Sequence, residues 1–589
     1  MYRAPLREFA FLLEELLDTA ALSALPPYEE YSAELATAVL GEAARFAETV
    51  LEPLNRSGDE EGAHWSPDGV TAPAGFKEAY LQFVEAGWPQ LGQAREQGGQ
   101  GAPLVLATAV QEIWASANLA FKLCPMLTHG AAHALELTGS REQRRLYLPK
   151  MVSGEWTGTM VLTEPQAGSD LGLIRTRAVP EGDHYRLFGQ KIFITWGDHD
   201  YTQNIIHLVL ARIEGAAAGT RGISLFIVPK VLVDASGKLG ARNDVRCVSI
   251  EHKLGIHASP TCVLAFGEEQ VALGYLVGEP NRGLEYMFIM MNTARLSVGL
   301  EGYAVAERAF QRAADWARTR VQGRSATTPG AAPIIQHPDV KRLLLTMKAS
   351  VEAMRATALY AALQLDLGAH EPDAARRAAA HARGELLIPI VKAWSTELGI
   401  EIASTGIQVH GGMGFIEETG AAQYLRDVRI TAIYEGTTGI QANDLIGRKI
   451  ARDGGATLSA LITEMRAQLD SLDATHPAAA IARTAAREAT GLLGEATQAL
   501  LGMLGAHPER AQGVAVPYLM LCGFVMGGWL MARAAAVAAA KLGGSERAFY
   551  LGKLATAQFY AEQVLPRALG LHRIVAQGAA STTLDPGLI

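Results

Sequence analysis

Cysteine, aromatic residues and charge are all scarce in this chain of 589 residues. It has 4 cysteines, 7% aromatic residues and 19% charged residues, against 49% hydrophobic residues. The cysteines Cys124, Cys247, Cys262 and Cys522 are far apart and form no Cys-x-x-Cys pair. Neither a metal site of the zinc type nor a disulfide framework is therefore expected. So few cysteines fit a reducing compartment and predict a cytoplasmic protein.

An excess of positive charge is also lacking. The net charge is −9, and residues 452–589 contain 11 basic and 10 acidic residues without a cluster. Binding to nucleic acid or to an anionic membrane surface requires an excess of Lys and Arg. Neither is expected as a partner. The first eight residues carry an early acid and no apolar stretch, so no signal peptide is expected there.

Long uncharged stretches are rare, with one exception at residues 511–532. By length and composition this segment could cross a membrane, and Gly523 and Gly527 have the GxxxG spacing of packed transmembrane helices. Pro517, the glycines and the continuation into an alanine-rich segment favour a different interpretation. We predict a helix that is buried on all sides in a soluble bundle, with the membrane span as the alternative.

The chain is too long for a single core, and the pattern of its residues changes three times. Helical periodicity covers residues 1–157, whereas short β-branched runs separated by turns cover residues 158–278. Helical periodicity returns over residues 279–452, interrupted by a loop at 323–333 that is rich in Ser, Thr, Pro and Gly. An Ala- and Leu-rich helical region follows at 453–589. The expected fold class is α+β with several domains, a β domain lying between helical ones.

Glu435 has the most informative surroundings of any potential catalytic residue. It lies in the sequence Ile-Tyr-Glu-Gly-Thr-Thr-Gly-Ile-Gln at residues 433–441. A carboxylate beside this turn joins a possible base to backbone N–H groups that a ligand can approach closely. Taken alone, the nine residues fit a helix cap or a solvated surface charge better.

A second motif lies far upstream. The sequence Leu-Thr-Glu-Pro-Gln-Ala-Gly-Ser-Asp occupies residues 162–170, after an expected strand. Gly168 and Ser169 then lie in a turn where the backbone can approach a flat ring system. Phe193 and Thr195 follow, and we expect them to share one face of the next strand. An ordinary strand-to-loop turn would also explain this motif.

In this order and at this spacing, the motifs resemble the acyl-CoA dehydrogenase family of flavoenzymes. The resemblance implies a helical N-terminal domain, a middle β-barrel-like domain and a C-terminal four-helix bundle, here followed by an extra helical domain. It also implies FAD as cofactor, an acyl-CoA substrate, and electron-transferring flavoprotein as the electron acceptor. The sequence Leu-Gly-Ile-His-Ala-Ser-Pro-Thr at residues 254–261 resembles a longer bacterial branch, with broad-chain, long-chain and 3-methylthiopropanoyl-CoA dehydrogenases.

The resemblance also implies roles for individual residues. Glu435 is the catalytic base, since the alternative position used by some members is occupied here by Ala294, which cannot abstract a proton. The implied cofactor-binding residues are Leu162, Thr163, Gly168, Ser169, Phe193, Thr195, Arg320, Gln408, Gly411, Gly412, Thr437 and Gly439. The implied substrate-binding residues are Ser169, Asn292, Arg295 and Gly436.

Several positions depart from the family pattern. Phe193 stands where Trp is usual, Asn292 replaces an acid, and Pro338 stands where a Gln is common. In the family, the arginine corresponding to Arg320 pairs with the flavin pyrophosphate of a neighbouring subunit, so a homodimer is expected, with a higher oligomer as the alternative. The sequence Gln-Val-His-Gly-Gly-Met-Gly at residues 408–414 matches a glycine-rich turn of the family. The match is strengthened by its spacing, because Gly414 precedes Glu435 by the number of residues usual in the family.

The expected reaction is FAD-dependent α,β-dehydrogenation of acyl-CoA thioesters to trans-2-enoyl-CoA, as in fatty-acid β-oxidation. One alternative is a 3-methylthiopropanoyl-CoA dehydrogenase, and another is an acyl-CoA oxidase that uses oxygen directly. A non-enzymatic, DNA-associated relative would require a basic C-terminal region, which residues 452–589 do not supply.

Overall fold

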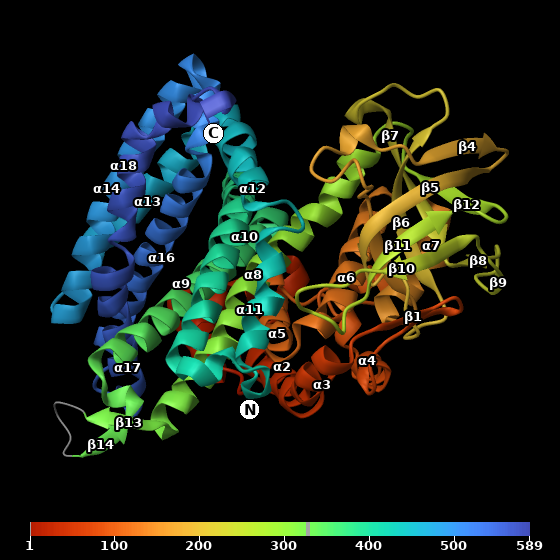
Figure 1. The fold of residues 1–589 in the computed structure, drawn as a ribbon. Coiled ribbons are helices and arrows are strands. Elements are labelled where there is room, and N and C mark those ends of the chain that lie inside the picture. Colours follow the sequence, from red (N-terminus) through yellow and green to blue (C-terminus); the bar gives the residue numbers. More distant parts are fainter. Residues whose placement is uncertain (1, 325–329, 589) are drawn as a thin grey trace. The chain divides into compact units, whose positions relative to one another are not determined.

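The structure is a computed structural model that describes residues 2–324 and 330–588 (Figure 1). The chain divides into two compact units. One consists of Met1–Ala44, Leu104–Ser116 and Arg295–Ile589, and the other of Arg45–Pro103 and Ala117–Ala294. We refer to them as the helical unit and the barrel unit, and each is described by itself.

An eight-stranded sheet forms the centre of the barrel unit. Strands β5, β12, β7, β6 and β4 close into a ring because β4 pairs with both β5 and β6. Strands β11 and β10 extend the sheet from β5, and β3 pairs in parallel with β6. The strands are β3 (Thr157–Val161), β4 (Arg177–Glu181), β5 (His184–Thr195), β6 (Ile205–Ile213), β7 (Ile223–Pro229), β10 (Val245–Ile250), β11 (Thr261–Phe266) and β12 (Ala272–Val277).

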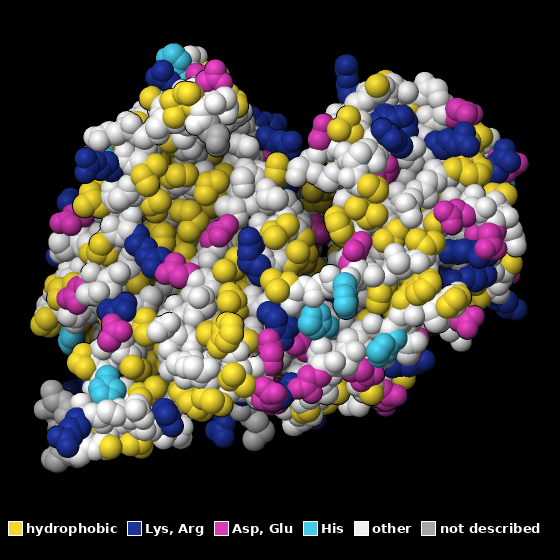
Figure 2. All heavy atoms as spheres, in the orientation of Figure 1, with side chains coloured by type: hydrophobic (Ala, Val, Ile, Leu, Met, Phe, Trp, Pro, Cys, Tyr) yellow, Lys and Arg dark blue, Asp and Glu magenta, His cyan; other side chains and the backbone are white. Residues whose placement is uncertain are grey.

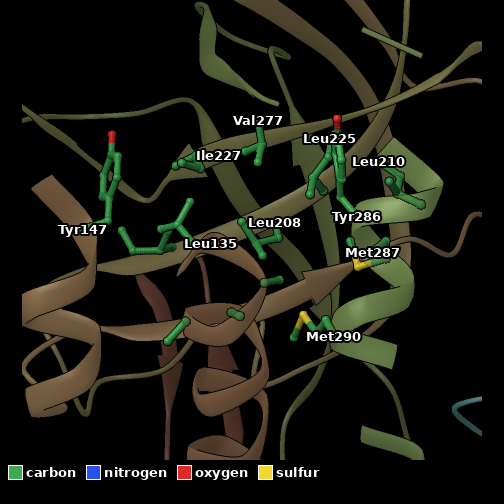
Figure 3. Close-up of a cluster of buried hydrophobic side chains, with 14 of the residues drawn as sticks. Leu135, Tyr147, Leu208, Leu210, Leu225, Ile227, Val277, Tyr286, Met287 and Met290 are labelled. Atoms are coloured by element: carbon green, nitrogen blue, oxygen red, sulfur yellow. The ribbon is translucent and has the colours of Figure 1, made fainter. Parts of the chain in front are cut away.

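Alternation along the strands explains why their sequences are apolar almost throughout. On β6, Leu208 and Leu210 belong to a cluster outside the ring, whereas Val209 and Ala211 belong to a second cluster. Figure 3 shows the outer cluster, where strand side chains such as Leu208 and Ile227 lie with helix side chains such as Leu135 and Met290. A strand buried on both faces needs apolar side chains at every position.

Helices and two short hairpins complete the barrel unit. The first hairpin corrects the prediction of a purely helical N-terminal region: Pro67 and Asp68 join its strands and Gly69 begins the second one, and Pro-Asp-Gly favours a tight turn over a helix. These elements are α3 (Glu52–Glu61), β1 (His64–Ser66), β2 (Gly69–Thr71), α4 (Phe76–Glu85), α6 (Leu119–Thr138), α7 (Arg141–Ser153), β8 (Val231–Val233) and β9 (Leu239–Arg242). Helix α8 (Gly283–Thr319) contributes to both units.

The helical unit contains a bundle in which α8 and α10 approach each other closely. A Cβ atom on Gly302 would lie 2.5 Å from the carbonyl oxygen of Ser395, and one on Gly399 would lie 2.4 Å from that of Gly302. Glycine permits this crossing because it has no side chain. The bundle and neighbouring helices are α1 (Leu6–Ala10), α2 (Ala33–Phe46), α5 (Leu104–Ala117), α9 (Pro338–His370), α10 (Ala374–His410), α11 (Ala421–Val428) and α12 (Thr438–Asp444).

The loop expected at residues 323–333 contains short strands in its described part. Strand β13 (Val321–Arg324) pairs antiparallel with β14 (Ala331–Pro333). Residues 325–329, which belong to the same expected loop, lie outside the described residues.

The C-terminal region, which also belongs to the helical unit, is an additional set of helices packed on the bundle. They are α13 (Ala456–Ser471), α14 (Pro477–Ala506), α15 (Pro508–Gly513), α16 (Ala515–Ala540), α17 (Arg547–Phe559) and α18 (Arg567–Gln577). Helix α16 packs against α9, α10, α14, α17 and α18. The chain therefore has the expected fold class, α+β with several domains and an extra C-terminal helical domain.

Helix α16 contains the uncharged segment that the sequence singled out. It is long and apolar enough to cross a membrane, yet 83% of its most apolar window is buried inside the protein. Gly523 lies against α10, since a Cβ atom there would come within 2.2 Å of the ring of Trp394. The prediction of a buried bundle helix is confirmed, and the glycine spacing allows close packing within the protein.

Candidate active site

In the helical unit, Glu435 occupies a strained turn directly before α12. Its φ is +53°, a left-handed conformation that costs a non-glycine residue about 1–3 kcal/mol. Gly436 follows with φ +91°, and a Cβ atom there would lie 2.6 Å from Gln441 Nε2. Glycine is therefore required at position 436. The side chain of Thr437 then caps α12 by accepting a hydrogen bond from the backbone N–H of Ile440 at 3.3 Å.

The environment of Glu435 raises the pKa of its carboxyl to near neutral pH. Burial raises the pKa of the Glu435 carboxyl to about 7, with a further increase from the nearby negative charge of Glu301. The positive charges of Lys392 and Arg295 act in the opposite direction. A carboxylate with a pKa near 7 can accept a proton at neutral pH and hold it, as a general base must.

Polar groups that the motif analysis did not single out surround this turn. Lys392 Nζ donates a hydrogen bond to the carbonyl oxygen of Gly436 at 2.7 Å, and Tyr434 donates its hydroxyl hydrogen to Glu301. Both Lys392 and Glu301 are completely buried. Each is a single charge within an apolar helical segment, and that pattern was the signal available in the sequence.

Arg295 and Asn292, which were predicted to bind the CoA portion, lie on α8. Arg295 is 3% exposed, and its Nη1 donates a hydrogen bond to Asp444 Oδ2 at 2.9 Å in a buried ion pair. Arg295 therefore has a partner within the protein, and its positive charge lowers the pKa of Glu435. Asn292 is half-buried. Their contact with CoA remains a prediction.

In the barrel unit, the segment 162–170 forms a tight turn held from beneath by Glu164. The backbone groups of Glu164 and Ala167 exchange two hydrogen bonds, at 3.0 Å and 2.9 Å. The Glu164 carboxylate pairs with Lys191 Nζ at 2.9 Å and accepts a bond from the hydroxyl of Thr176 at 2.6 Å. Although burial raises the pKa of Glu164, Lys191 and these hydrogen bonds outweigh it and lower that pKa to about 2.

The turn leaves Gly168 and Ser169 exposed, whereas Thr163 is half-buried and Leu162 is buried. A Cβ atom on Gly168 would have no neighbour closer than 3.9 Å, so the backbone there is open to a ligand. Lys191 Nζ donates to the carbonyl oxygen of Leu162 at 2.8 Å.

Phe193 is 58% exposed, which is unusual for an aromatic residue in a strand. Its φ is +61°, and the pairing of β5 with β11 is irregular there, since Ile194 faces Cys262 but Lys191 faces Leu264. The bulge breaks the alternation of β5 between Lys191 and Phe193. Phe193 is exposed and Thr195 is half-buried, whereas Ile194 between them is buried.

The other predicted cofactor residues lie in the helical unit. Gln408 is exposed near the end of α10, and Gly411 and Gly412 after it have open space around their Cα atoms. Arg320 is exposed, and its guanidinium has no hydrogen bond or ion pair with the described residues. Gly439 is half-buried in α12. A cavity of about 320 Å³ lies beside the turn that begins at Gly411. It is lined by Arg308, Arg312, Asp315, Trp316, Thr319, His410 and Thr419.

Comparison with known proteins identifies the family. Three domain families match in order: acyl-CoA dehydrogenase N-terminal domain at residues 34–155, middle domain at 159–268 and C-terminal domain at 281–450. A 3-methylmercaptopropionyl-CoA dehydrogenase of Ruegeria pomeroyi is 48% identical over 99% of both chains. The chain belongs to the acyl-CoA dehydrogenase family. A broad-specificity linear acyl-CoA dehydrogenase of Mycobacterium tuberculosis is 37% identical over 96% of both chains.

The extra C-terminal helices are shared with other acyl-CoA dehydrogenases. A domain described as acetyl-CoA dehydrogenase C-terminal like matches residues 461–585. The Caenorhabditis elegans protein ACDH-11, solved with C11-CoA, has the same fold, with a TM-score of 0.78 over 96% of this chain and 92% of its own at 21% identity. An acyl-CoA dehydrogenase of Bacillus anthracis, solved with FAD, gives 0.74 over 96% and 91% at 21% identity.

The residues in the barrel unit fit the flavin that the acyl-CoA dehydrogenase family uses. An exposed aromatic side chain, Phe193, offers a flat apolar surface, and the open backbone at Gly168 permits close approach of a ring. The hydroxyl of Ser169 lies on the exposed part of the turn. FAD is accordingly the cofactor of this protein.

Proposed function

We propose that the protein converts acyl-CoA thioesters to trans-2-enoyl-CoA, with Glu435 as the base. The observation that carries this proposal is the carboxyl of Glu435, with a pKa raised to about 7, on a strained turn in an acyl-CoA dehydrogenase. The position used as base by some relatives holds Ala294. Glu435 therefore takes the proton from the α-carbon of the thioester.

The backbone at Glu435 can assist this proton transfer. Among the described residues, the N–H of Glu435 makes no hydrogen bond. A free N–H beside the base can donate to the thioester oxygen, where negative charge develops as the α-proton leaves. The left-handed conformation of Glu435 thus frees a donor at the residue that removes the proton.

FAD, when bound, supplies the acceptor for the hydride that leaves the β-carbon. The turn at residues 162–170 and Phe193 would hold its ring system, with Thr163, Ser169 and Thr195 as polar neighbours. As the family resemblance implies, Gln408, Gly411 and Gly412 would hold the pyrophosphate and adenosine end, and Arg320 would pair with the pyrophosphate of a neighbouring subunit's FAD. Thr437 and Gly439 would contribute near the base.

The substrate we favour is 3-methylmercaptopropionyl-CoA, the compound called 3-methylthiopropanoyl-CoA above. The support is the 48% identity over nearly the whole length to a dehydrogenase named for that thioester, against 37% to the broad-specificity relative. We therefore favour 3-methylmercaptopropionyl-CoA over the straight-chain acyl-CoA substrates of fatty-acid β-oxidation. The proposed reaction removes one hydrogen from each of the two methylene carbons between sulfur and carbonyl.

A panel of thioesters tests this choice. We expect 3-methylmercaptopropionyl-CoA to give the highest kcat/KM with a dye acceptor, at least about tenfold above octanoyl-CoA, because an unsuited chain loses about 1–3 kcal/mol of binding. Butyryl-CoA serves as the control of similar length without sulfur. Faster turnover of octanoyl-CoA would contradict the substrate proposal while leaving the dehydrogenase assignment intact.

The electron acceptor we propose is electron-transferring flavoprotein, as for the family. The same panel run with dissolved oxygen as sole acceptor tests the oxidase alternative. We expect turnover with dye or with electron-transferring flavoprotein and negligible formation of hydrogen peroxide. Peroxide formation at the rate of dye reduction would identify an oxidase instead.

We also propose a homodimer in the cytoplasm. Arg320 is an exposed cation without a partner among the described residues, as expected of a group that reaches a neighbouring subunit's cofactor. The four cysteines are free thiols, which suits a reducing compartment. On the face shown in Figure 2, acidic and basic side chains are intermingled.

Replacing Arg320 by Met tests the proposed dimer. We expect light scattering to show a dimer for the FAD-loaded wild-type protein, and Arg320→Met to lose FAD at least about tenfold more readily because a charge-assisted pair contributes about 1.5–3 kcal/mol. The exposed Arg318 on α8 provides a control, Arg318→Met, with unchanged FAD retention. A monomer that retains stoichiometric FAD would contradict the proposal.

A further inference from the structure

Lys392 is a buried lysine next to the proposed base, and the reaction described above gives it no role. It lies on α10, is 0% exposed, and stands alone among apolar residues at 386–394. A buried ammonium group is unfavourable unless it is hydrogen-bonded or paired. Its Nζ donates to the carbonyl oxygen of Gly436 at 2.7 Å, and Gly436 directly follows the base.

The turn that carries the base needs such support. Glu435 is one of few non-glycine residues here with positive φ, and strained backbone persists only where the surroundings hold it. The buried Gln441 donates from Nε2 to the carbonyl oxygens of Glu435 at 3.1 Å and Gly436 at 3.2 Å. Two consecutive carbonyl groups are thus held by two buried side chains, of which Lys392 alone is charged.

The electrostatic role of Lys392 follows from the groups that surround Glu435. Burial raises the pKa of the Glu435 carboxyl to about 7, and Lys392 is the strongest influence that lowers it. Burial also lowers the pKa of Lys392, to about 8, so the ammonium keeps its proton at neutral pH. The charged and titratable groups facing this site are Arg295 and Glu301 on α8, Lys392 and Glu397 on α10, Asp444 on α12, and Tyr434.

We infer that Lys392 is a positioning residue for Glu435: its ammonium group holds the carbonyl after the base and balances the charge of the carboxylate. The inference rests on the proposed function, in which Glu435 removes the α-proton. Lys392 acts through Glu435 and its turn. Gln441 holds the same turn without charge, which makes it the matched comparison.

Replacing Lys392 and Gln441 each by Met separates the effect of the charge from the effect of the hydrogen bond. Lys392→Met removes the donor and the charge, Gln441→Met removes a donor only, and Lys392→Arg retains a charge. Each FAD-loaded variant is mixed anaerobically with 3-methylmercaptopropionyl-CoA or butyryl-CoA, and the bleaching of the flavin is followed as a function of pH. Retained FAD and an unchanged circular dichroism spectrum show that the variants are folded.

We expect Lys392→Met to move the midpoint of the pH profile upward by about one unit, so that below the midpoint its rate falls about tenfold in addition to the pH-independent loss that it shares with Gln441→Met. Lys392→Arg should return the midpoint toward the wild-type value. Gln441→Met should lower the rate equally at all pH values. A wild-type midpoint in Lys392→Met, whether or not its rate is lowered equally at all pH values, would overturn the inference.

Glu435→Gln, measured in parallel, keeps this test distinct from that of the proposed function. If Glu435→Gln bleaches at the wild-type rate, the assignment of the base has failed. If Glu435→Gln is inactive while Lys392→Met keeps the wild-type midpoint, only the inference about Lys392 has failed.

Discussion

Glu435→Gln is expected to give a folded, yellow, FAD-loaded protein whose flavin acyl-CoA does not bleach. Removal of a general base slows a reaction by about 10²–10⁴-fold, and Ala294 at the alternative position cannot replace it. Glutamine keeps the size of the side chain, so the strained turn and the hydrogen bonds from Lys392 and Gln441 to the backbone should persist. The measurement is the single-turnover rate of flavin reduction under anaerobic conditions.

The matched control is Glu142→Gln, which removes an exposed carboxylate that pairs with Arg145 on the surface of α7. An exposed ion pair contributes about 0–1 kcal/mol, so this variant should reduce its flavin at the wild-type rate. Ready flavin reduction by Glu435→Gln would remove Glu435 from the role of base.

Deletion of residues 455–589 is expected to abolish soluble, active protein. Helix α16 packs on α9 and α10, and it covers Trp394, which is completely buried. Each large apolar side chain that loses its cover forfeits about 1.5–3 kcal/mol, and many would do so together. The exposed apolar surface should cause aggregation.

Charge strengthens the same expectation. Lys553 of α17 pairs with Glu8 at 2.6 Å and with Glu352 of α9 at 2.7 Å, and all three side chains are buried. The deletion would remove Lys553 and leave Glu8 without this cation, whereas Glu352 would keep its ion pair with Lys348. Removing one partner from a buried ion pair costs about 3–5 kcal/mol where the remaining charge stays buried.

The outcome is measured as the soluble fraction and FAD content after expression. A shorter deletion of residues 584–589 serves as the control, because residues 584–588 are exposed and should be dispensable. A soluble, FAD-loaded and fully active enzyme ending at Gly454 would show that the C-terminal helices are an independent appendage.

Periodicity and motif spacing were sufficient to predict the layout of the fold. The β-branched runs after Thr157 are strands, and the uncharged segment at 511–532 is in buried helix. The hairpin at 64–71 was missed because each of its strands is too short to show an alternating pattern. Ring closure by β4 was beyond reach as well, because β4 forms a local hairpin with β5 but must also pair in parallel with β6, on the far side of β5 in the sequence.

The site was only partly predictable. Motifs identified Glu435 and the turn at 162–170, because their neighbours in sequence carry the pattern. Lys392 and Glu301 lie near Glu435 in space but on other helices. A motif covers only residues that are neighbours in sequence, so it could not identify them. The buried pairing of Arg295 with Asp444 was likewise hidden. A single charged residue within an apolar helix was the signal that the sequence contained, because a charge is rarely buried without a partner.

Flavin reduction in the wild-type protein shows whether Glu435 removes the α-proton of an acyl-CoA. The FAD-loaded protein is mixed anaerobically with 3-methylmercaptopropionyl-CoA, with and without deuterium at the α-carbon, on both sides of pH 7. Since the carboxyl of Glu435 has a pKa near 7 and acts when deprotonated, the rate should rise with pH through about 7 and fall about tenfold per pH unit below it. Deuterium at the α-carbon should slow it. A rate that is constant across neutral pH and insensitive to α-deuterium would rule out Glu435 as the base that removes the α-proton.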